Sequence, residues 1–210
     1  MKIVITSLHN ITHLGHLNLL KDAASLGNEL IVIVNTDEQI RKRGTCPLFD
    51  EKFRMELIKS LWFVSDVRLA IDDDCGVADT LRKIVYDYNF VYNVMDKFTG
   101  AKQELEYIFA KGGSDRSSLS ELPEKEQQAI KDCGIELKCG VGGFSKVNST
   151  TDITERITEF TMKHKYKPII EDMVKLMEEI CFRHNKVTFQ EDRDDWNLAK
   201  NTLLEACYCR

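Results

Sequence analysis

The sequence predicts an α/β protein, a Rossmann-like parallel sheet with helices on both faces, followed by a C-terminal helical extension. Short apolar runs alternate along the chain with segments in which apolar residues recur at helical spacing. The run ELIVIVN at residues 29–35 is continuous and rich in β-branched residues, as expected of a strand buried on both faces of a sheet. Repeated strand–helix–strand units indicate parallel strands joined by helical crossovers.

The expected elements follow one another in a regular order. The first strand covers residues 2–6, and the helix after it ends near Gly27, because glycine commonly terminates helices. After the second strand, at 29–35, we expect a helix near 50–60, a strand near 63–71, a helix near 76–86, a strand at 106–110, a helix near 123–132, a strand at 135–141 and a last helix beginning near Ser149. Residues 87–105 break this rhythm and are interpreted as an insertion.

The character of the chain changes from Lys163 onward. One apolar stripe at helical spacing runs from Ile169 to Ile180, and a second follows from Trp196 to Leu204. We therefore expect a first domain over residues 1–163 and a helical extension over 164–210. Short helices are marginal in water on their own, so these stripes must pack against the same subunit or against a second copy.

Composition narrows the possible functions. A formal net charge of -5 and a pI near 5.6 argue against binding of nucleic-acid backbones. The chain has no apolar run long enough for a membrane helix and no signal-peptide pattern at its start, so no membrane role is expected. Seven cysteines without a CxxC pair indicate reduced thiols in a cytoplasmic protein, and no metal site is expected among them.

Two histidines follow the first expected strand. His13 and His16 lie in THLGH, where a helix begins, and ligands of open parallel sheets bind beyond the carboxyl ends of the strands. A helix N-terminus offers N–H groups to phosphate, imidazoles at i and i+3 share one face, and Gly15 permits close approach to the backbone. A phosphate site is predicted here, and the alternative is a pair of solvated loop histidines.

The segment HLGHLNLLKDAASLGNELIVIVNTDE resembles the opening of the cytidylyltransferase-like superfamily, the H-x-G-H nucleotidyltransferases. Glycerol-3-phosphate cytidylyltransferase and the adenylyltransferase that makes ADP-heptose belong to it. A second segment, NSTTDITERI, resembles the serine-threonine triplet that opens the last helix of that fold. By itself, Ser149 followed by Asp152 is a helix-capping pattern. The resemblance implies that this triplet binds the β- and γ-phosphates of a nucleotide.

The resemblance implies roles for further residues. Arg54 matches an arginine that faces the triphosphate, and Arg43 falls where relatives carry a lysine that contacts the reacting phosphates; the alternative for RKR is a solvated patch. The block FAKGGSDR resembles a stretch of the heptose-type adenylyltransferases. The implied catalytic residues are His13, His16 and Arg43. The implied nucleotide-binding residues are Ser7, Leu8, His13, Gly15, His16, Arg54, Lys111, Gly112, Gly113, Ser149, Thr150 and Thr151, and the implied acceptor-binding residues are Asn10, Asp37 and Arg43.

The chain also departs from the family pattern. Relatives usually carry G-T-F-D or G-C-F-D where this chain has Ser7, Leu8, His9 and Asn10, so an aspartate expected near the acceptor is replaced by an amide. Members of the cytidylyl branch carry an arginine where Phe144 falls. These departures leave the choice of nucleotide open.

The resemblance implies direct transfer of CMP or AMP from CTP or ATP to a sugar- or polyol-phosphate acceptor, with release of pyrophosphate. Such enzymes act by positioning and charge stabilisation, and Mg²⁺ would travel with the NTP. One alternative is an adenylyltransferase for a cofactor precursor such as FMN or phosphopantetheine, against which the KGG block speaks. Another is a catalytically weak nucleotide-binding sensor. Because relatives are commonly dimers and two-fold pairing is the usual outcome, a homodimer is expected.

Overall fold

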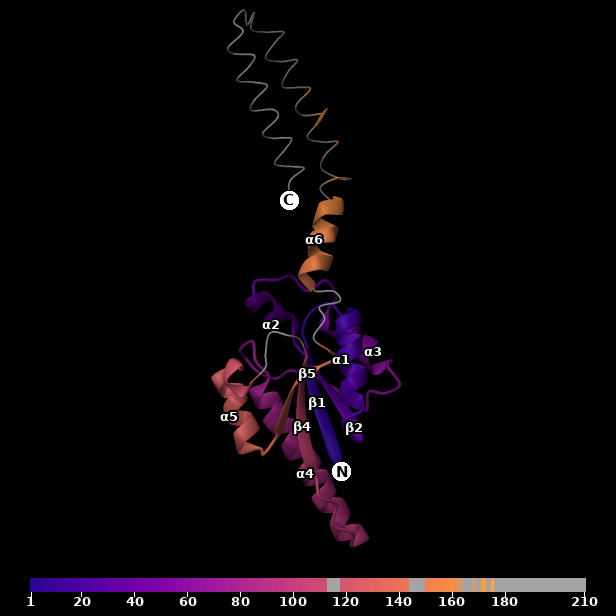
Figure 1. Cartoon of the computed structure of the whole chain (residues 1–210), viewed down its shortest axis with the longest axis vertical. Helices are drawn as coiled ribbons and strands as arrows, with labels where there is room; N and C mark the ends of the chain where they lie inside the picture. The colour runs from indigo at the N-terminus through magenta and orange to yellow at the C-terminus, as the bar shows by residue number, and fades with distance from the viewer. Residues whose placement is uncertain are drawn as a thin grey trace, which may run out of the picture. The chain divides into compact units, whose positions relative to one another are not determined.

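The apolar runs of the sequence form a sheet of parallel strands in the computed structural model (Figure 1). The strands are β1 (Lys2–Leu8), β2 (Glu29–Val34), β3 (Asp66–Leu69), β4 (Glu106–Gly112) and β5 (Glu136–Val141). Their order across the sheet is β3-β2-β1-β4-β5, and each neighbouring pair is parallel. The order reverses between β1 and β4, and a reversal of this kind is where open α/β sheets bind ligands.

Helices cover both faces of this sheet, as expected. Helices α1 (Leu14–Ala24) and α3 (Glu51–Lys59) pack on one face, and α4 (Ala78–Thr99) and α5 (Glu124–Asp132) pack on the other. Successive side chains of a strand point to opposite faces, so Ile31 and Ile33 of β2 join the α4 and α5 cluster while Val32 joins the α1 and α3 cluster. The predicted Rossmann-like parallel sheet with helices on both faces is confirmed.

The structure describes residues 1–112, 118–143 and 150–161, together with single residues between 163 and 175. Contacts divide the chain into two compact units, Met1–Thr150 and Thr151–Arg210. The domain boundary expected after residue 163 stays a prediction. Helix α6 (Thr150–Thr161) begins next to the expected start at Ser149. Gly113 and Ser149, the side chains of Thr150 and Thr151, and nearly all of 164–210 lie outside the described residues.

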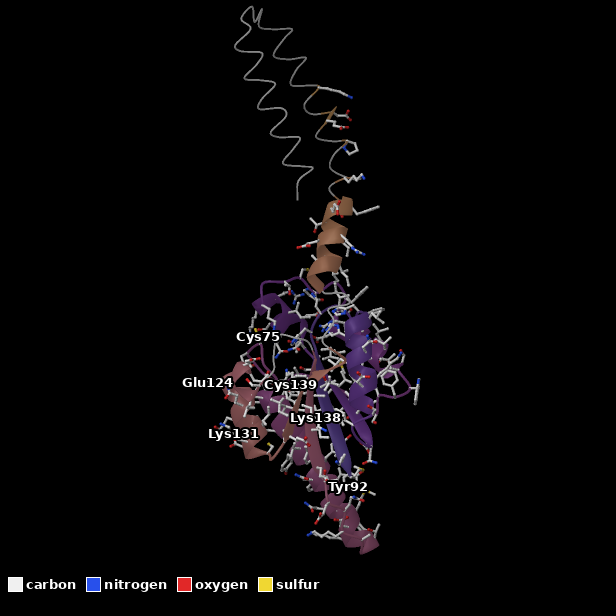
Figure 2. All side chains as sticks on the ribbon, viewed as in Figure 1. Cys75, Tyr92, Glu124, Lys131, Lys138 and Cys139 are labelled. Atoms are coloured by element: carbon white, nitrogen blue, oxygen red, sulfur yellow. The ribbon has the colours of Figure 1, made fainter. Side chains whose placement is uncertain are left out.

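Helix α4 is longer than the sequence predicts. It continues to Thr99, where Gly100 caps it at a φ of 71°, so the interpretation of residues 87–105 as an insertion is wrong for most of that segment. The signal was weak because no residue of this helix after Val85 is buried. In this exposed part of the helix, the hydroxyl of Tyr92, which Figure 2 labels, donates a hydrogen bond to the sulfur of Met1 at 3.3 Å.

Two short helices complete the described fold, α2 (Asp37–Lys42) and a 3-10 turn, η1 (Leu119–Glu121). Helix α2, which begins with a capping box, was not expected from the sequence. The hydroxyl of Thr36 accepts from the backbone N–H of Gln39 at 3.1 Å, and the Gln39 side chain accepts from the N–H of Thr36 at 3.0 Å. None of the helices in the described part of the chain is long and apolar enough to cross a membrane.

Candidate active site

The loop after β1 brings two imidazoles together at the start of α1. His13 is the N-cap residue of α1, and its ring stacks on that of His16 with centroids 3.9 Å apart and an interplanar angle of 28°. Gly15 lies between them in the first turn, where backbone N–H groups have no partner within the helix. The spacing of the pair thus places both rings on one face, beside N–H groups suited to an anion.

His16 is held in a defined protonation state. Its Nδ1 lies 3.0 Å from the carbonyl oxygen of Ile11, and because a carbonyl only accepts, Nδ1 carries the proton. Burial, and then the neighbouring His13, lower the pKa of His16 to about 4. At pH 7 the ring is neutral, with its lone pair on Nε2. A phosphate oxygen at Nε2 would favour protonation of that nitrogen and would therefore raise the pKa.

The ends of β4 and β5 fix the position of α1. A Cβ atom on Gly112 would lie 3.0 Å from Cδ2 of Leu19. Gly142, at a φ of +89°, passes closer still, and a Cβ there would lie 2.6 Å from the backbone nitrogen of Leu19. Such an approach is open only to glycine. Gly112, predicted to contact nucleotide, is placed against the helix that carries His16.

Arg54 is buried and bonded to the protein. Its Nη1 donates to the carbonyls of His9 and Asn35, each at 2.7 Å, and its Nε donates to the carbonyl of Phe49 at 3.1 Å. Its Nη2 pairs with the Asp37 carboxylate at 2.5 Å. The guanidinium thereby joins the loop after β1, the end of β2 and the start of α2. The expected contacts of Arg54 with triphosphate and of Asp37 with the acceptor stay predictions.

The remaining residues predicted on β1, on β4 and in the loop after β1 also have contacts within the fold. Lys111 extends its ammonium to the Ser7 hydroxyl at 3.2 Å and to the Glu126 carboxylate at 3.5 Å, and both ionic side chains are almost fully buried. Leu8 is a core residue. Asn10 donates to the carbonyl of Cys46 at 2.8 Å and so holds the loop after α2. Their contacts with ligands stay predictions.

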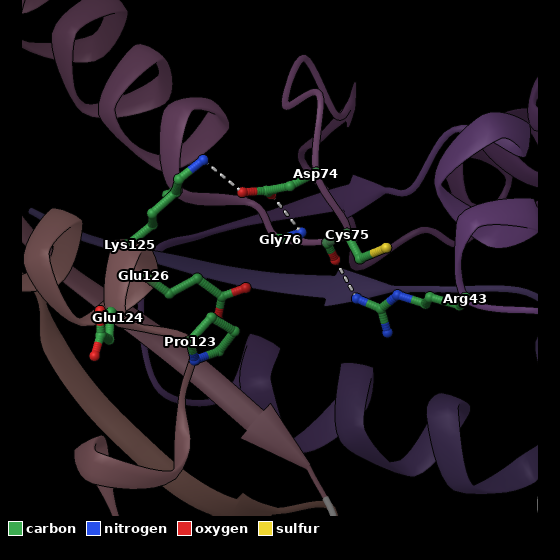
Figure 3. A pocket seen from close by; sticks show the side chains of 9 residues that line it. Arg43, Asp74, Cys75, Gly76, Pro123, Glu124, Lys125 and Glu126 are labelled. Atoms are coloured by element: carbon green, nitrogen blue, oxygen red, sulfur yellow. Dashed lines mark hydrogen bonds and ion pairs between the residues drawn. The ribbon is translucent and has the colours of Figure 1, made fainter.

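A cavity of about 580 Å³ opens beside Arg43 (Figure 3), within the size range of small-molecule sites. The end of α2, the loop between β3 and α4, and the start of α5 form its walls. Its lining residues are Arg43, Asp74, Cys75, Gly76, Ala78, Pro123, Glu124, Lys125 and Glu126. Figure 2 shows two of them, Cys75 and Glu124, near the carboxyl ends of the strands. Charges of both signs line it, and Lys125 pairs with Asp74 at 2.8 Å.

Three further residues beside this cavity were not assigned a role from the sequence. His9, Asn35 and Gln39 connect Arg43 to the loop over residues 72–76. Asn35 and Gln39 are each 1% exposed, and a buried amide needs its hydrogen bonds satisfied. The sequence contains two weak signals for these residues. Asn35 is a polar residue directly after an apolar strand, and Thr36 with Gln39 forms a helix-start pattern.

Because the imidazoles of His9 and His16 are neutral in the folded protein, we expect its stability to fall at acid pH. Their pKa values are about 3 and about 4 in the folded protein, against about 6.5 in an unfolded chain. The unfolded state therefore binds more protons, and stability falls as the pH drops from 6.5 toward 4. Urea unfolding between pH 7.5 and 5 should show a slope of at most about 1.4 kcal/mol per pH unit for each histidine. The variant His16→Gln should show a shallower slope, and a flat wild-type profile would contradict the assignment.

Comparison with known proteins shows the family. The model of the cytidylyltransferase-like family matches residues 8–133, more than half of the chain. The chain belongs to the cytidylyltransferase-like family. The matched range holds His13, His16, Arg43 and Arg54, so this cytidylyltransferase-like domain includes the stacked imidazoles and the cavity. The expected enzyme class, nucleotidyltransferase, is confirmed at the level of the family.

Relatives of this cytidylyltransferase-like chain are named FAD synthase. That of Thermoplasma acidophilum is 38% identical over 95 residues, which are 43% of this chain and 67% of the relative. The FAD synthase of Thermoplasma volcanium is 38% identical over 35% of this chain and 52% of the relative. The FAD synthase of Pyrococcus horikoshii is 41% identical over 32% of this chain and 46% of the relative. The chain thus spans about two thirds of the first and about half of the other two.

The chain is also similar to a solved structure. It is that of the lipopolysaccharide core biosynthesis protein from Thermoplasma volcanium GSS1, with 28% sequence identity and a TM-score of 0.47. The match covers 70% of this chain and 98% of that protein.

Proposed function

We propose that this chain transfers AMP from ATP to FMN, forming FAD and pyrophosphate. The observation that carries the proposal is the 38% identity to an FAD synthase of which the chain spans 67%. An adenylyltransferase for a cofactor precursor is one of the alternatives that the sequence leaves open. The relatives favour it over transfer of CMP to a sugar or polyol phosphate, the first interpretation, and they outweigh the likeness of FAKGGSDR to the heptose-type enzymes.

The proposed reaction is a direct displacement. A phosphate oxygen of FMN attacks the α-phosphorus of ATP, the bond from that phosphorus to the bridging oxygen breaks, and the bond's electrons leave with pyrophosphate. We assign the α- and β-phosphates to His13 and His16 at the start of α1, where a proton on Nε2 of His16 would offset the charge on the leaving oxygen. We assign the FMN phosphate to Arg43 and the flavin ring to the 580 Å³ cavity.

Mg²⁺ enters this proposal as part of the nucleotide. The described residues hold no group of three or more histidine, cysteine, aspartate or glutamate side chains that could hold a metal ion. We assign the ion to the triphosphate and water. The homodimer expected from the sequence is part of the same proposal, to be tested by light scattering.

The test is a matrix of nucleotides and acceptors. Purified protein is incubated with ATP or CTP and with FMN, glycerol 3-phosphate or 4′-phosphopantetheine, and pyrophosphate release and the coupled product are measured. FAD from ATP and FMN is the expected result. CDP-glycerol formation without FAD would overturn the proposal in favour of the first interpretation. ATP binding without turnover of any acceptor would favour a sensor, and saturating ATP at 100 times Kd would then raise stability by about 2.7 kcal/mol.

A further inference from the structure

A chain of side-chain hydrogen bonds starts at Arg43 and runs away from the cavity. Nη1 of Arg43 lies 3.1 Å from Nε2 of His9, and Nδ1 of His9 lies 2.6 Å from Oδ1 of Asn35. The Asn35 amide then donates to Oε1 of Gln39 at 2.7 Å. These residues come from the loop after β1, the end of β2, and the first turn and the end of α2.

The chain of bonds returns to the cavity through the loop over residues 72–76. The Gln39 amide nitrogen lies 3.1, 2.8 and 3.0 Å from the carbonyl oxygens of Asp72, Asp74 and Gly76, respectively. Arg43 closes the ring by donating from Nη2 to the carbonyl of Cys75 (Figure 3). The arginine and the opposite wall of the cavity therefore belong to one hydrogen-bonded ring.

The Arg43 guanidinium and the backbone carbonyls of the 72–76 loop fix the direction of every hydrogen bond in this ring. A guanidinium only donates and a backbone carbonyl only accepts. His9 must therefore accept from Arg43 at Nε2 and donate to Asn35 from Nδ1, which is the neutral Nδ1–H tautomer. Burial, then the charges of Arg43 and Lys111, lower the pKa of His9 to about 3, in agreement with this assignment. A second proton, on Nε2, would be directed at an N–H group of Arg43.

We propose that His9 is a positioning residue that orients Arg43 and the 72–76 loop for the phosphate of the acceptor. This inference rests on the proposed function, because it takes Arg43 as the acceptor's phosphate ligand. Arg43 is exposed, and without partners its side chain would sample many rotamers. The entropy lost when substrate holds it in one rotamer would weaken binding. The bonds from His9 and from the carbonyl of Cys75 hold it in one arrangement before substrate arrives.

His9 is suited to this role by its place in the chain. It lies four residues before His13, in the loop that joins β1 to α1, so the same loop supports the leaving-group end and the acceptor end of the site. It is also one of the departures from the family pattern, and so is arginine in place of lysine at position 43. The structure places these two residues in contact at 3.1 Å.

Substitution of His9 by asparagine or by glutamine tests its hydrogen bonds to Asn35 and to Arg43 one at a time. An asparagine amide nitrogen can occupy the place of Nδ1, so His9→Asn keeps the donor to Asn35 and loses the acceptor for Arg43. A glutamine oxygen can occupy the place of Nε2, so His9→Gln keeps the acceptor for Arg43 and loses the donor. We expect His9→Asn to raise the KM for FMN about tenfold, the scale of one lost charge-assisted hydrogen bond, with the KM for ATP unchanged.

His9→Gln is the matched control, and its KM for FMN should stay within about threefold of wild type. Equal losses in both variants, accompanied by equal losses of melting temperature, would show a merely structural role and overturn the proposal. Should His9→Asn fail to fold, His9→Phe keeps a ring of similar size without an acceptor. It is expected to raise the KM for FMN in the same way.

A double-mutant cycle tests whether His9 acts through Arg43. In an Arg43→Ala background, His9→Asn should have no further effect on the KM for FMN, because the group that it positions is absent. Residues in contact show such non-additivity, whereas independent sites add. Additive effects of the two substitutions would overturn the proposal.

A measurement without turnover separates this inference from the proposed function. Long-range ¹H–¹⁵N spectra of wild-type protein should show His9 protonated at Nδ1 and neutral from pH 5 to 8. ¹⁵N relaxation of the Arg43 side chain should show restricted motion in wild type and in His9→Gln, and increased motion in His9→Asn. If wild type makes no FAD while these signals are as expected, the proposed function fails and the positioning of Arg43 stands. Equal mobility of Arg43 in all three proteins would overturn the positioning.

Discussion

Replacing His16 with alanine is expected to lower kcat by roughly 10²–10³-fold, the scale for losing one group that stabilises the transition state. The ring is held by the carbonyl of Ile11 at 3.0 Å and by stacking on His13, so it is positioned before the reaction begins. Charge develops on the leaving oxygen only in the transition state, and the affinity for ATP should therefore change much less than kcat. The measurements are pyrophosphate release at saturating substrates and ATP titration by calorimetry.

The control for this variant is Lys21→Ala. Lys21 is an exposed residue in the last turn of the same helix, and its removal should leave kcat and ATP affinity unchanged. Turnover close to wild type in folded His16→Ala protein would refute the role assigned to the histidine pair. It would favour the alternative given for this pair, two loop histidines near a helix start without a role in phosphate binding.

Replacing Arg54 with alanine is expected to lower the free energy of unfolding by about 3–5 kcal/mol, the cost of removing one partner of a buried ion pair. The Asp37 carboxylate would lose its partner at 2.5 Å, and the carbonyls of His9 and Asn35 would lose their donor. Arg54→Lys should not restore stability, because a single ammonium cannot span acceptors that a guanidinium meets with three nitrogens. Urea unfolding at pH 7 measures the change.

Arg68→Ala is the matched control for Arg54→Ala. Arg68 pairs with Asp66 at 2.6 Å, but its side chain is 41% exposed, and exposed pairs contribute at most about 1 kcal/mol. A loss below 1 kcal/mol in Arg54→Ala, together with a large rise in the KM for ATP, would contradict the structural role. That outcome would instead support the direct triphosphate contact implied by the family resemblance.

The sequence was sufficient to predict the sheet because buried parallel strands are long apolar runs. ELIVIVN contains β2, and each of the other four expected strands overlaps an observed one. It was not sufficient for the second half of α4, because residues 86–99 are largely exposed and exposed helices carry little apolar periodicity. It also missed α2, since a helix of six residues is too short for a periodic pattern and is marked only by its cap.

The sequence by itself determined which side chains meet at the start of α1, because helical geometry brings residues three apart onto one face. His13 and His16 were therefore assigned together, and the family model covers both. Only the tertiary structure decided the partners of Arg43 and Arg54. His9, Asn35 and the 72–76 loop are far from one another in the chain and meet where parallel strands end side by side. A guanidinium donates hydrogen bonds to the acceptors that the fold places around it, and the local sequence does not predict which residues supply them.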